Sequence, residues 1–287
     1  MNETVARQDR LINQQQLRRM IRNCAAYPQL EELFGPARAS EFSELVFEAE
    51  LSKRAPGNLY ITLSPAELPE FDRYLNAVVG GECNQVNTKR EYVMDLLRRA
   101  LEGSLRKGLD LPEPSGDKHG KISFRQEDTE SEIKKAADWI CLTMHSNPHD
   151  QVVDMLRDAV ADAPPKAVLG QDTGLLDRIH KRVAPGAPRL RGPNPEMPYP
   201  SNVGGRMLLE TVFQWTANAE WPAAGDSRWF DVALFYLGVI GTVQGFPDGN
   251  KRVARSAYAI ALLRNRCRFV APSRELVADL FKMRSET

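Results

Sequence analysis

The chain has 287 residues, of which 42% are hydrophobic and 26% are charged, a composition typical of soluble globular proteins. This length accommodates one large domain or two ordinary ones, and the composition excludes a wholly disordered, collagen-like or fibrous chain. Basic and acidic residues balance at 38 each. A protein that binds nucleic acid non-specifically carries a large positive excess, so no nucleic-acid partner is expected. From residue 181 onward, however, 15 basic residues face 9 acidic ones, which suits a phosphate-bearing ligand.

Cysteine spacing and hydropathy indicate the compartment. The four cysteines lie far apart and form no CxxC pair, so neither a disulfide framework nor a zinc site is expected. The N-terminus has no apolar segment of the kind that secretory signals carry. The longest nearly apolar run, residues 232–243, has twelve residues, whereas crossing a bilayer takes about 20. We therefore expect a cytoplasmic protein without a membrane partner, and export by a route that needs no classical signal is left open.

Helical spacing of apolar residues dominates the first 110 positions. Residues 10–26 and 92–105 each place large aliphatic side chains along one stripe, the pattern of an amphipathic helix. Between them, the sequence of residues 58–63 is typical of a short strand. No catalytic constellation is visible in this part. These features predict a mostly helical N-terminal domain of unknown role at residues 1–110, followed by a linker at residues 111–120 that is rich in helix breakers.

The remainder, residues 121–287, is predicted to be a second helical domain. Periodic apolar patterns predict helices over residues 131–145, 174–183, 206–217 and 253–264. Residues 228–243 are apolar nearly all round, which indicates a central buried helix. The segment 185–200 contains six prolines and cannot form regular helix. The fold class predicted for the whole chain is mainly α.

The loop that follows the buried helix concentrates the chemistry. Residues 244–255 read QGFPDGNKRVAR. A tight turn at Gly249 and Asn250 leads into a helix, so free backbone N–H groups and the positive helix end point at one spot. Lys251 and Arg252 add full positive charges there. This arrangement predicts an anion site.

Two more residues extend this anion site. Arg255 lies three residues after Arg252 and therefore on the same helix face. Asp248 supplies a hard oxygen ligand beside the anion site, where a magnesium ion could bridge phosphates. An acidic ligand, a set of amides and two arginines together describe a site for the phosphates of a nucleotide. An ordinary capped loop is the alternative interpretation of the same residues.

The segment resembles the signature of the Fic/Doc family, H-P-F-x-(D/E)-G-N-(G/K)-R-x-x-R. Upstream, residues 175–182 resemble the helix that opens the Fic core. The proline-rich segment takes the place of the family's flap, and residues 206–217 resemble the helix after it. The resemblance covers residues 130–285 and implies a Fic-type helical core with a short flap, preceded by the helical N-terminal domain. The motif residues that match are Phe246, Asp248, Gly249, Asn250, Lys251, Arg252 and Arg255.

The resemblance implies a domain that binds ATP or another nucleotide and transfers a phosphate-containing group, usually AMP, to a protein hydroxyl. Asp248 is expected to hold Mg²⁺, and Phe246 to anchor the loop in the core. The catalytic candidates are Gln244, at the position of the family's histidine, together with Asn250 and Arg252. The residues expected to bind the phosphates are Gly249, Asn250, Lys251, Arg252 and Arg255.

The chain departs from the family pattern at the catalytic position. Gln244 stands where the family has the histidine that deprotonates the incoming hydroxyl, and Gly245 replaces the proline that follows. A glutamine amide accepts no proton near neutral pH, so general-base help, typically worth about 10²–10⁴-fold in rate, is lost. Phosphate binding does not depend on that base. Of the four histidines, only His180 lies in a matched segment, and it is interpreted as a structural residue of an amphipathic helix.

Two further comparisons with the family bear on the reaction and its regulation. Lys251 resembles the Doc branch, which transfers the γ-phosphate, although that branch usually has alanine where this chain has Gly249. Many family members carry an autoinhibitory pattern, (S/T)-x-x-x-E-(G/N). In this chain the only glutamate followed by glycine or asparagine is Glu102, and the residue four positions before it is Arg98 instead of serine or threonine, so this form of autoinhibition is not supported.

Three functions are therefore weighed. The first is an AMP-transfer-type transferase with impaired or non-standard activity. The second is a catalytically inactive Fic pseudoenzyme that acts as a binding module. The partners expected for the chain are a nucleotide and a protein that is either the hydroxyl substrate or a regulatory partner. The third is a Doc-like phosphotransferase. Whether the chain is an enzyme is left open at this point.

Overall fold

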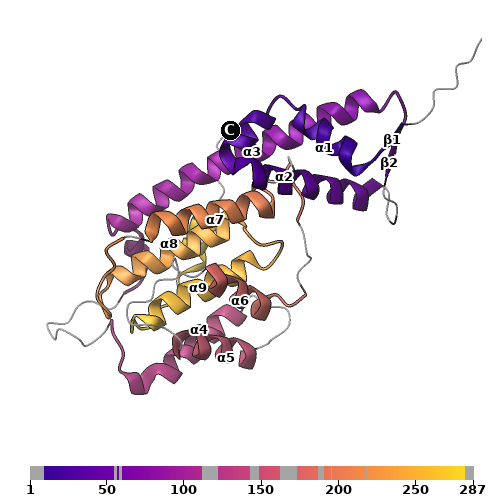
Figure 1. Cartoon of the computed structure of the whole chain (residues 1–287). Coiled ribbons are helices and arrows are strands. Elements are labelled where there is room, and N and C mark those ends of the chain that lie inside the picture. Colours follow the sequence, from indigo (N-terminus) through magenta and orange to yellow (C-terminus); the bar gives the residue numbers. More distant parts are fainter. Residues whose placement is uncertain are drawn as a thin grey trace, which may run out of the picture.

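The computed structural model describes residues 10–54, 57, 60–111, 122–142, 149–161, 173–186, 191–194, 196–217 and 219–281. Within these ranges the chain consists of helices and two strands of three residues each (Figure 1). The mainly α fold class is confirmed. In the same ranges, no helix is long and apolar enough to cross a membrane.

The described elements follow one another in this order: β1 (Arg10–Ile12), α1 (Gln14–Arg22), α2 (Tyr27–Arg54), β2 (Ile61–Leu63), α3 (Leu68–Leu101), α4 (Thr129–Cys141), α5 (His149–Ala161), α6 (Thr173–Val183), α7 (Asn202–Thr216), α8 (Arg228–Val243), α9 (Asn250–Arg264) and α10 (Arg274–Phe281). Two 3₁₀ turns, Leu105–Gly108 and Gln126–Asp128, lie between α3 and α4.

The start of the chain differs from the single helix expected over residues 10–26. β1 pairs antiparallel with β2, and α1 begins only at Gln14. Asn13 is the reason: its Oδ1 accepts the backbone N–H of Gln16 at 2.9 Å, and Gln16 Oε1 accepts the N–H of Asn13 at 2.9 Å. This reciprocal capping box sets the beginning of the helix, and the residues before it are free to pair as a strand.

α3 runs for 34 residues and extends well beyond the helix expected at residues 92–105. It contacts α1 and α2 in the N-terminal part and also α7 and α8 in the C-terminal part, so one helix joins both regions (Figure 1). The domain boundary at residues 111–120 stays a prediction, because residues 112–121 lie outside the described ranges.

α8 forms the centre of the core, as its sequence predicts. From residue 229 to residue 243 every side chain except Val232 is buried. α9 lies along α8, while α4, α5 and α6 pack against α9. A helix that is apolar on all sides has to be enclosed by other elements. The chain therefore leaves α8 for the 244–255 loop from inside the protein.

Gly205 lets the first turn of α7 lie directly against the end of α8. A Cβ atom at this position would be 2.3 Å from the carbonyl oxygen of Val243 and 2.9 Å from the carbonyl carbon of Gln244. These neighbours are backbone atoms, which cannot rotate away. Gly204 and Gly205 both lie in α7, which begins at Asn202 and therefore earlier than the helix expected over residues 206–217.

We expect Gly205→Ala to destabilise the protein by about 1–3 kcal/mol, the usual cost of forcing an extra methyl group into a filled space. Gly80→Ala is the matched control, since Gly80 also lies inside a helix and its Cβ would be 3.8 Å from the nearest atom, an ordinary contact. That control should be neutral or more stable by up to about 1 kcal/mol. Urea unfolding of both variants measures the difference. Equal stability of the two would contradict the close contact.

Candidate functional site

Two left-handed turns shape the loop between α8 and α9. Gln244 ends α8 with φ of 58° and ψ of 45°, and Gly249 precedes α9 with φ of 76°. Glycine adopts positive φ at little cost, while other residues seldom do. At Gly249 a Cβ would also lie 2.6 Å from the Cβ of Ala184. Both the turn and the packing therefore require glycine at this position.

Asn250 holds the loop closed from the inside. Its side chain is 3% exposed, its Oδ1 accepts the N–H of Phe246 at 2.8 Å, and its Nδ2 donates to the carbonyl of Phe246 at 2.7 Å. Both halves of the amide are thus used by the loop itself. The N–H groups of the first turn of α9 have no carbonyl partner within the helix, and they are the atoms that could meet an anion.

Phe246 fixes the loop to the rest of the core, and its side chain is 4% exposed. The ring of His180, from α6, stacks on it with centroids 4.5 Å apart, and the guanidinium of Arg206, from α7, lies 5.7 Å from its centroid. Arg206 is itself held by a bidentate bond to Asp177 at 2.8 and 2.9 Å. The loop is therefore clamped by two neighbouring helices.

Arg252 and Asp248 lie together at the start of α9. Arg252 donates to the carboxylate of Asp248 at 3.2 Å and to the carbonyl of Val183 at 2.7 Å. The Asp248 side chain is 59% exposed. An exposed carboxylate beside free helix amides has the hard-oxygen chemistry that Mg²⁺ takes from proteins, usually with phosphate oxygens completing its shell, so this residue fits a magnesium ligand.

Lys251 and Arg255 differ in their surroundings. Lys251 is exposed. Arg255 is half-buried, its guanidinium lies 5.1 Å from the ring centroid of Trp139, and burial lowers its pKa. The structure thus brings Asp248 and Arg252 into contact, leaves Lys251 in solvent and places Arg255 against α4.

Arg191 is the residue of this site that sequence reasoning missed. Its guanidinium donates to the Oε1 of Gln244 at 3.2 Å, to the backbone carbonyl of Gln244 and to the carbonyl of Pro200 at 3.0 Å. It also lies 4.8 Å from the ring centroid of Tyr199. Arg191 belongs to the proline-rich segment, where it and Arg189 form no recognised motif, so no sequence signal pointed to it.

The charges around Arg191 come from three elements. Burial lowers the pKa of its guanidinium, while Tyr199, Glu82 and Asp248 act in the opposite direction. The guanidinium of Arg191 therefore interacts electrostatically with the carboxylate of Asp248 across the loop. The Nε atom of Arg191 is buried and has no hydrogen-bond partner in the structure.

Glu82 of α3 connects the N-terminal part of the chain to this site. Its carboxylate is buried, accepts the backbone N–H of Ser201 at 2.9 Å and accepts the Ser201 hydroxyl at 2.8 Å. Burial raises the pKa of Glu82 to about 7, against the opposing effect of Ser201 and Arg191. A glutamate at helical spacing with buried Val78, Val79 and Val86 is the sequence signal that could have revealed it.

His180 contacts the 244–255 loop directly. Besides stacking on Phe246, its Nε2 lies 3.0 Å from the carbonyl oxygen of Asp248, so the ring donates through this nitrogen. Burial lowers the pKa of His180, which favours the neutral ring. The arrangement gives His180 a structural role, in agreement with the sequence interpretation.

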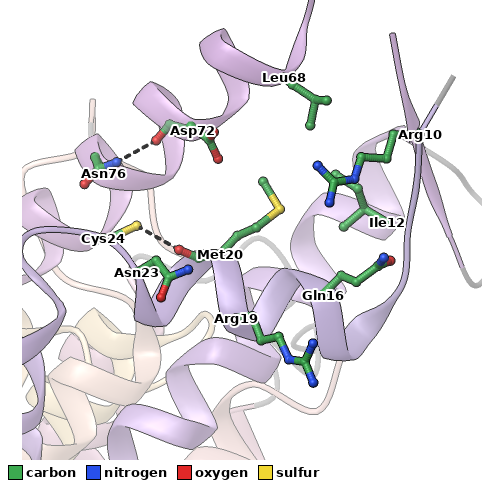
Figure 2. A pocket seen from close by; sticks show the side chains of 10 residues that line it. All are labelled: Arg10, Ile12, Gln16, Arg19, Met20, Asn23, Cys24, Leu68, Asp72 and Asn76. Atoms are coloured by element: carbon green, nitrogen blue, oxygen red, sulfur yellow. Dashed lines mark hydrogen bonds between the residues drawn. The ribbon is translucent and has the colours of Figure 1, made fainter. Parts of the chain in front are cut away.

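A hollow lies in the N-terminal part of the chain, between β1, α1 and α3 (Figure 2). Its volume is about 580 Å³, and it contains none of the residues of the 244–255 loop. Asn76 and Cys24 in its wall already bond to backbone carbonyls of Asp72 and Met20. The hollow is lined by Arg10, Ile12, Gln16, Arg19, Met20, Asn23, Cys24, Leu68, Asp72 and Asn76.

The fold is that of a Fic-domain protein. The structure superimposes on the crystal structure of the Fic domain containing AMPylator VopS with a TM-score of 0.58 over 93% of this chain and 82% of that chain, at 18% sequence identity. At this level of identity the match establishes the fold and no more.

The amino-acid sequence is related to the same protein. The chain is 31% identical over 147 residues to protein adenylyltransferase VopS of Vibrio parahaemolyticus serotype O3:K6 (strain RIMD 2210633). The match takes in 50% of this chain and 36% of VopS, so the aligned part spans about a third of that relative's length. No model of a known protein family matches the chain.

Stability should depend on pH through Glu82. Because burial raises the pKa of Glu82 in the folded state from 4.5 to about 7, the folded protein binds an extra proton between these values. The resulting stabilisation is complete below pH 4.5 and is lost as the pH rises through 7, by roughly 3 kcal/mol in total. Glu82→Gln keeps an acceptor for Ser201 and should lack this dependence.

Urea unfolding of wild type and Glu82→Gln at pH 5 and pH 8 tests this expectation. Glu70→Gln, at a carboxylate that is 74% exposed, is the control and should follow the wild type. Parallel pH profiles for wild type and Glu82→Gln would show that the buried carboxyl does not titrate in this range.

Proposed function

We propose that this chain is a member of the Fic family and transfers AMP from ATP to a protein acceptor at the 244–255 loop. The observation that carries the proposal is the juxtaposition of Asp248 and Arg252, 3.2 Å apart, at the amide end of α9 behind the left-handed turn of Gly249. The sequence relationship to an adenylyltransferase and the shared fold support it.

The proposal assigns a task to each motif residue. The backbone amides of Gly249, Asn250 and Lys251 receive phosphate oxygens, since a helix N-terminus favours negative charge. Arg252 binds phosphate through its guanidinium after the ion pair between Arg252 and Asp248 has broken. Arg255 adds positive charge one turn further along α9, and Asn250 keeps the loop in shape.

Asp248 would hold Mg²⁺, an ion that neutralises phosphate charge when bound. The carboxylate of Asp248 is paired with the guanidinium of Arg252. The carboxylate of this ion pair is 59% exposed and the guanidinium 28%, so the pair is worth little, about 1 kcal/mol or less, and phosphates can displace it at small cost. A magnesium ion at Asp248 thus competes with a weak ion pair, while the bond from Arg252 to the carbonyl of Val183 can remain in place.

The reaction proceeds without a histidine base at the usual position. The amide of Gln244 accepts no proton near neutral pH, so the contribution of about 10²–10⁴-fold from general-base catalysis is missing. The remaining rate acceleration comes from positioning the nucleotide and from the fixed positive charges of the loop, which are preorganised before ATP binds.

A binding module without turnover is the second candidate. The observation that favours it is the engagement of Gln244, whose Nε2 donates to the carbonyl of Gly241 at 2.6 Å while its Oε1 accepts from Arg191. A residue held in this way is structural. Transfer of the γ-phosphate, as in the Doc branch, is the third candidate and is suggested by Lys251 alone.

Thermal unfolding with and without Mg-ATP tests the phosphate site. Saturation at about 100 times the dissociation constant adds about 2.7 kcal/mol of stability, so the wild type should melt several degrees higher with the ligand. The ligand-induced shift should disappear in Arg252→Ala and persist in Arg98→Ala, which removes an arginine of α3 that is 61% exposed. A wild type that shows no shift with any nucleoside triphosphate would contradict the proposal.

The position of the label in ATP separates the candidate reactions. We expect radioactivity from [α-³²P]ATP to appear on protein and radioactivity from [γ-³²P]ATP to remain in pyrophosphate. Retention of the γ-label on protein would establish phosphotransfer instead. Binding without either label on protein would favour the module.

A further inference from the structure

The hollow between β1, α1 and α3 combines an apolar floor with a charged wall. Ile12 at the floor is 1% exposed, and the half-buried side chains of Met20 and Leu68 line the same hollow. Arg10 and Arg19 of the wall are exposed. The volume of about 580 Å³ lies within the roughly 300–1,000 Å³ of known ligand sites. A ligand that fills the hollow therefore meets apolar surface below and charge at the sides.

The two arginines of the wall are available to a ligand. Within the part of the chain that the structure describes, neither Arg10 nor Arg19 forms a hydrogen bond or an ion pair through its side chain. Arg18, which does not line the hollow, is paired with Glu44. Figure 2 shows the side chain of Arg10 reaching from β1 toward Met20, while Arg19 lies at the rim. Each guanidinium has five N–H donors that a ligand can use.

Other polar groups of the wall hold the hollow in shape. The Oδ1 of Asn76 accepts the N–H of Ala25 at 3.0 Å, and its Nδ2 donates to the carbonyl of Asp72 at 2.9 Å. The thiol of Cys24 contacts the carbonyl of Met20 at 3.5 Å. Burial raises the pKa of Cys24 to about 11, so the thiol is protonated near neutral pH and is a poor nucleophile. The hollow is therefore suited to binding and not to covalent chemistry.

The charge of this surface favours an acidic ligand. Residues 10–30 contain no aspartate or glutamate and four arginines, Arg10, Arg18, Arg19 and Arg22. The lining itself carries two arginines and one acidic residue, Asp72 of α3. A polyphosphate would bring several negative charges close to that carboxylate. A polypeptide offers carboxylates for the arginines and also backbone N–H donors for Asp72, so its chemistry complements the whole lining.

The shape of the surface favours a protein segment over a lipid bilayer. Proteins that bind at a membrane surface present their apolar side chains outward, whereas Ile12 lies at the floor of a hollow. Leu11 is 59% exposed, but successive residues of a strand point to opposite faces, so Leu11 faces away from the side that holds Arg10 and Ile12. An extended segment can insert one side chain into the hollow while its carboxylates reach the wall.

We propose that this hollow binds an acidic segment of a partner protein. One apolar side chain of the segment packs on Ile12, Met20 and Leu68, and its carboxylates pair with Arg10 and Arg19. Methionine adapts to side chains of different shape, so Met20 accommodates more than one apolar residue. The hollow contains none of the residues of the 244–255 loop, so the inference does not depend on the proposed nucleotide chemistry. Its role is to attach a partner to the N-terminal part of the chain.

Selection from a random peptide library tests the chemistry of the ligand. The library is displayed on phage and selected against the immobilised full chain in the absence of nucleotide. We expect the selected peptides to carry at least two acidic residues beside one large apolar residue. Fluorescence anisotropy of such a peptide gives its Kd, which should rise as NaCl is increased from about 0.05 M to about 0.5 M, because salt screens the charge pairs. Selection of basic or uncharged peptides, or of none, overturns the proposal.

Variants of the arginines locate the site. Arg10→Gln should weaken binding of the selected peptide about five- to tenfold, and Arg19→Gln, at the rim, about two- to fivefold. Arg22→Gln is the matched control, since Arg22 is an exposed arginine of the same helix that does not line the hollow. It should bind like the wild type. Equal weakening by all three variants would show attraction to a basic face and contradict a site in the hollow.

Two further measurements separate this proposal from its alternatives. Arg10→Gln should keep the wild-type melting temperature and the wild-type Mg-ATP melting shift, so loss of peptide binding is distinguished from misfolding and from loss of the nucleotide site. Cosedimentation with vesicles of phosphatidylcholine and phosphatidylserine tests the bilayer as the occupant. Binding to these vesicles that disappears in Arg10→Gln, together with a library that yields no peptide, would overturn the protein segment in favour of a membrane surface.

Discussion

The buried end of α8 is the constraint on which the site depends. Because α8 is enclosed on all sides, the chain has to turn inside the protein, and it does so through a left-handed residue, Gln244. That turn is stabilised from three directions: Arg191 binds its carbonyl, Gly241 receives its amide, and Gly205 admits α7 to within contact of its backbone. The loop that follows is thereby presented in one conformation, closed by Asn250, before any ligand arrives.

The same constraint connects the N-terminal helices to the 244–255 loop. α3 places Glu82 under the first turn of α7, and the carboxylate binds Ser201, which caps that helix. Arg191 lies between Glu82 and Gln244 and is affected by both. The N-terminal part of the chain is therefore joined to the loop by one buried carboxyl, one helix cap and one guanidinium, which are in direct contact or close electrostatic range.

Local patterns predicted much of this correctly. The apolar run of α8 permits only burial, and a glycine before Asn250, Lys251 and Arg252 indicates a turn into a helix whose amides are free. Such features depend on a few adjacent residues, so they can be predicted from the sequence alone. The start of α1 was misplaced, because the capping box of Asn13 and Gln16 outweighed the apolar periodicity that continues before it. α3 was predicted too short, since its first half has a stripe that is interrupted by buried polar residues such as Glu82.

The sequence by itself therefore determined the helical class, the central buried helix and the tight turn that leads into α9, all properties of contiguous residues. Only the tertiary structure decided that Arg191 lies against Gln244 and Glu82 against Ser201. Arg191 is 53 residues from Gln244 along the chain and Glu82 is 119 residues from Ser201. Such pairings arise when helices pack, and no local periodicity or spacing encodes them. The contact between Arg191 and Gln244 consequently could not be predicted until α3, α7, α8 and the proline-rich segment were seen together.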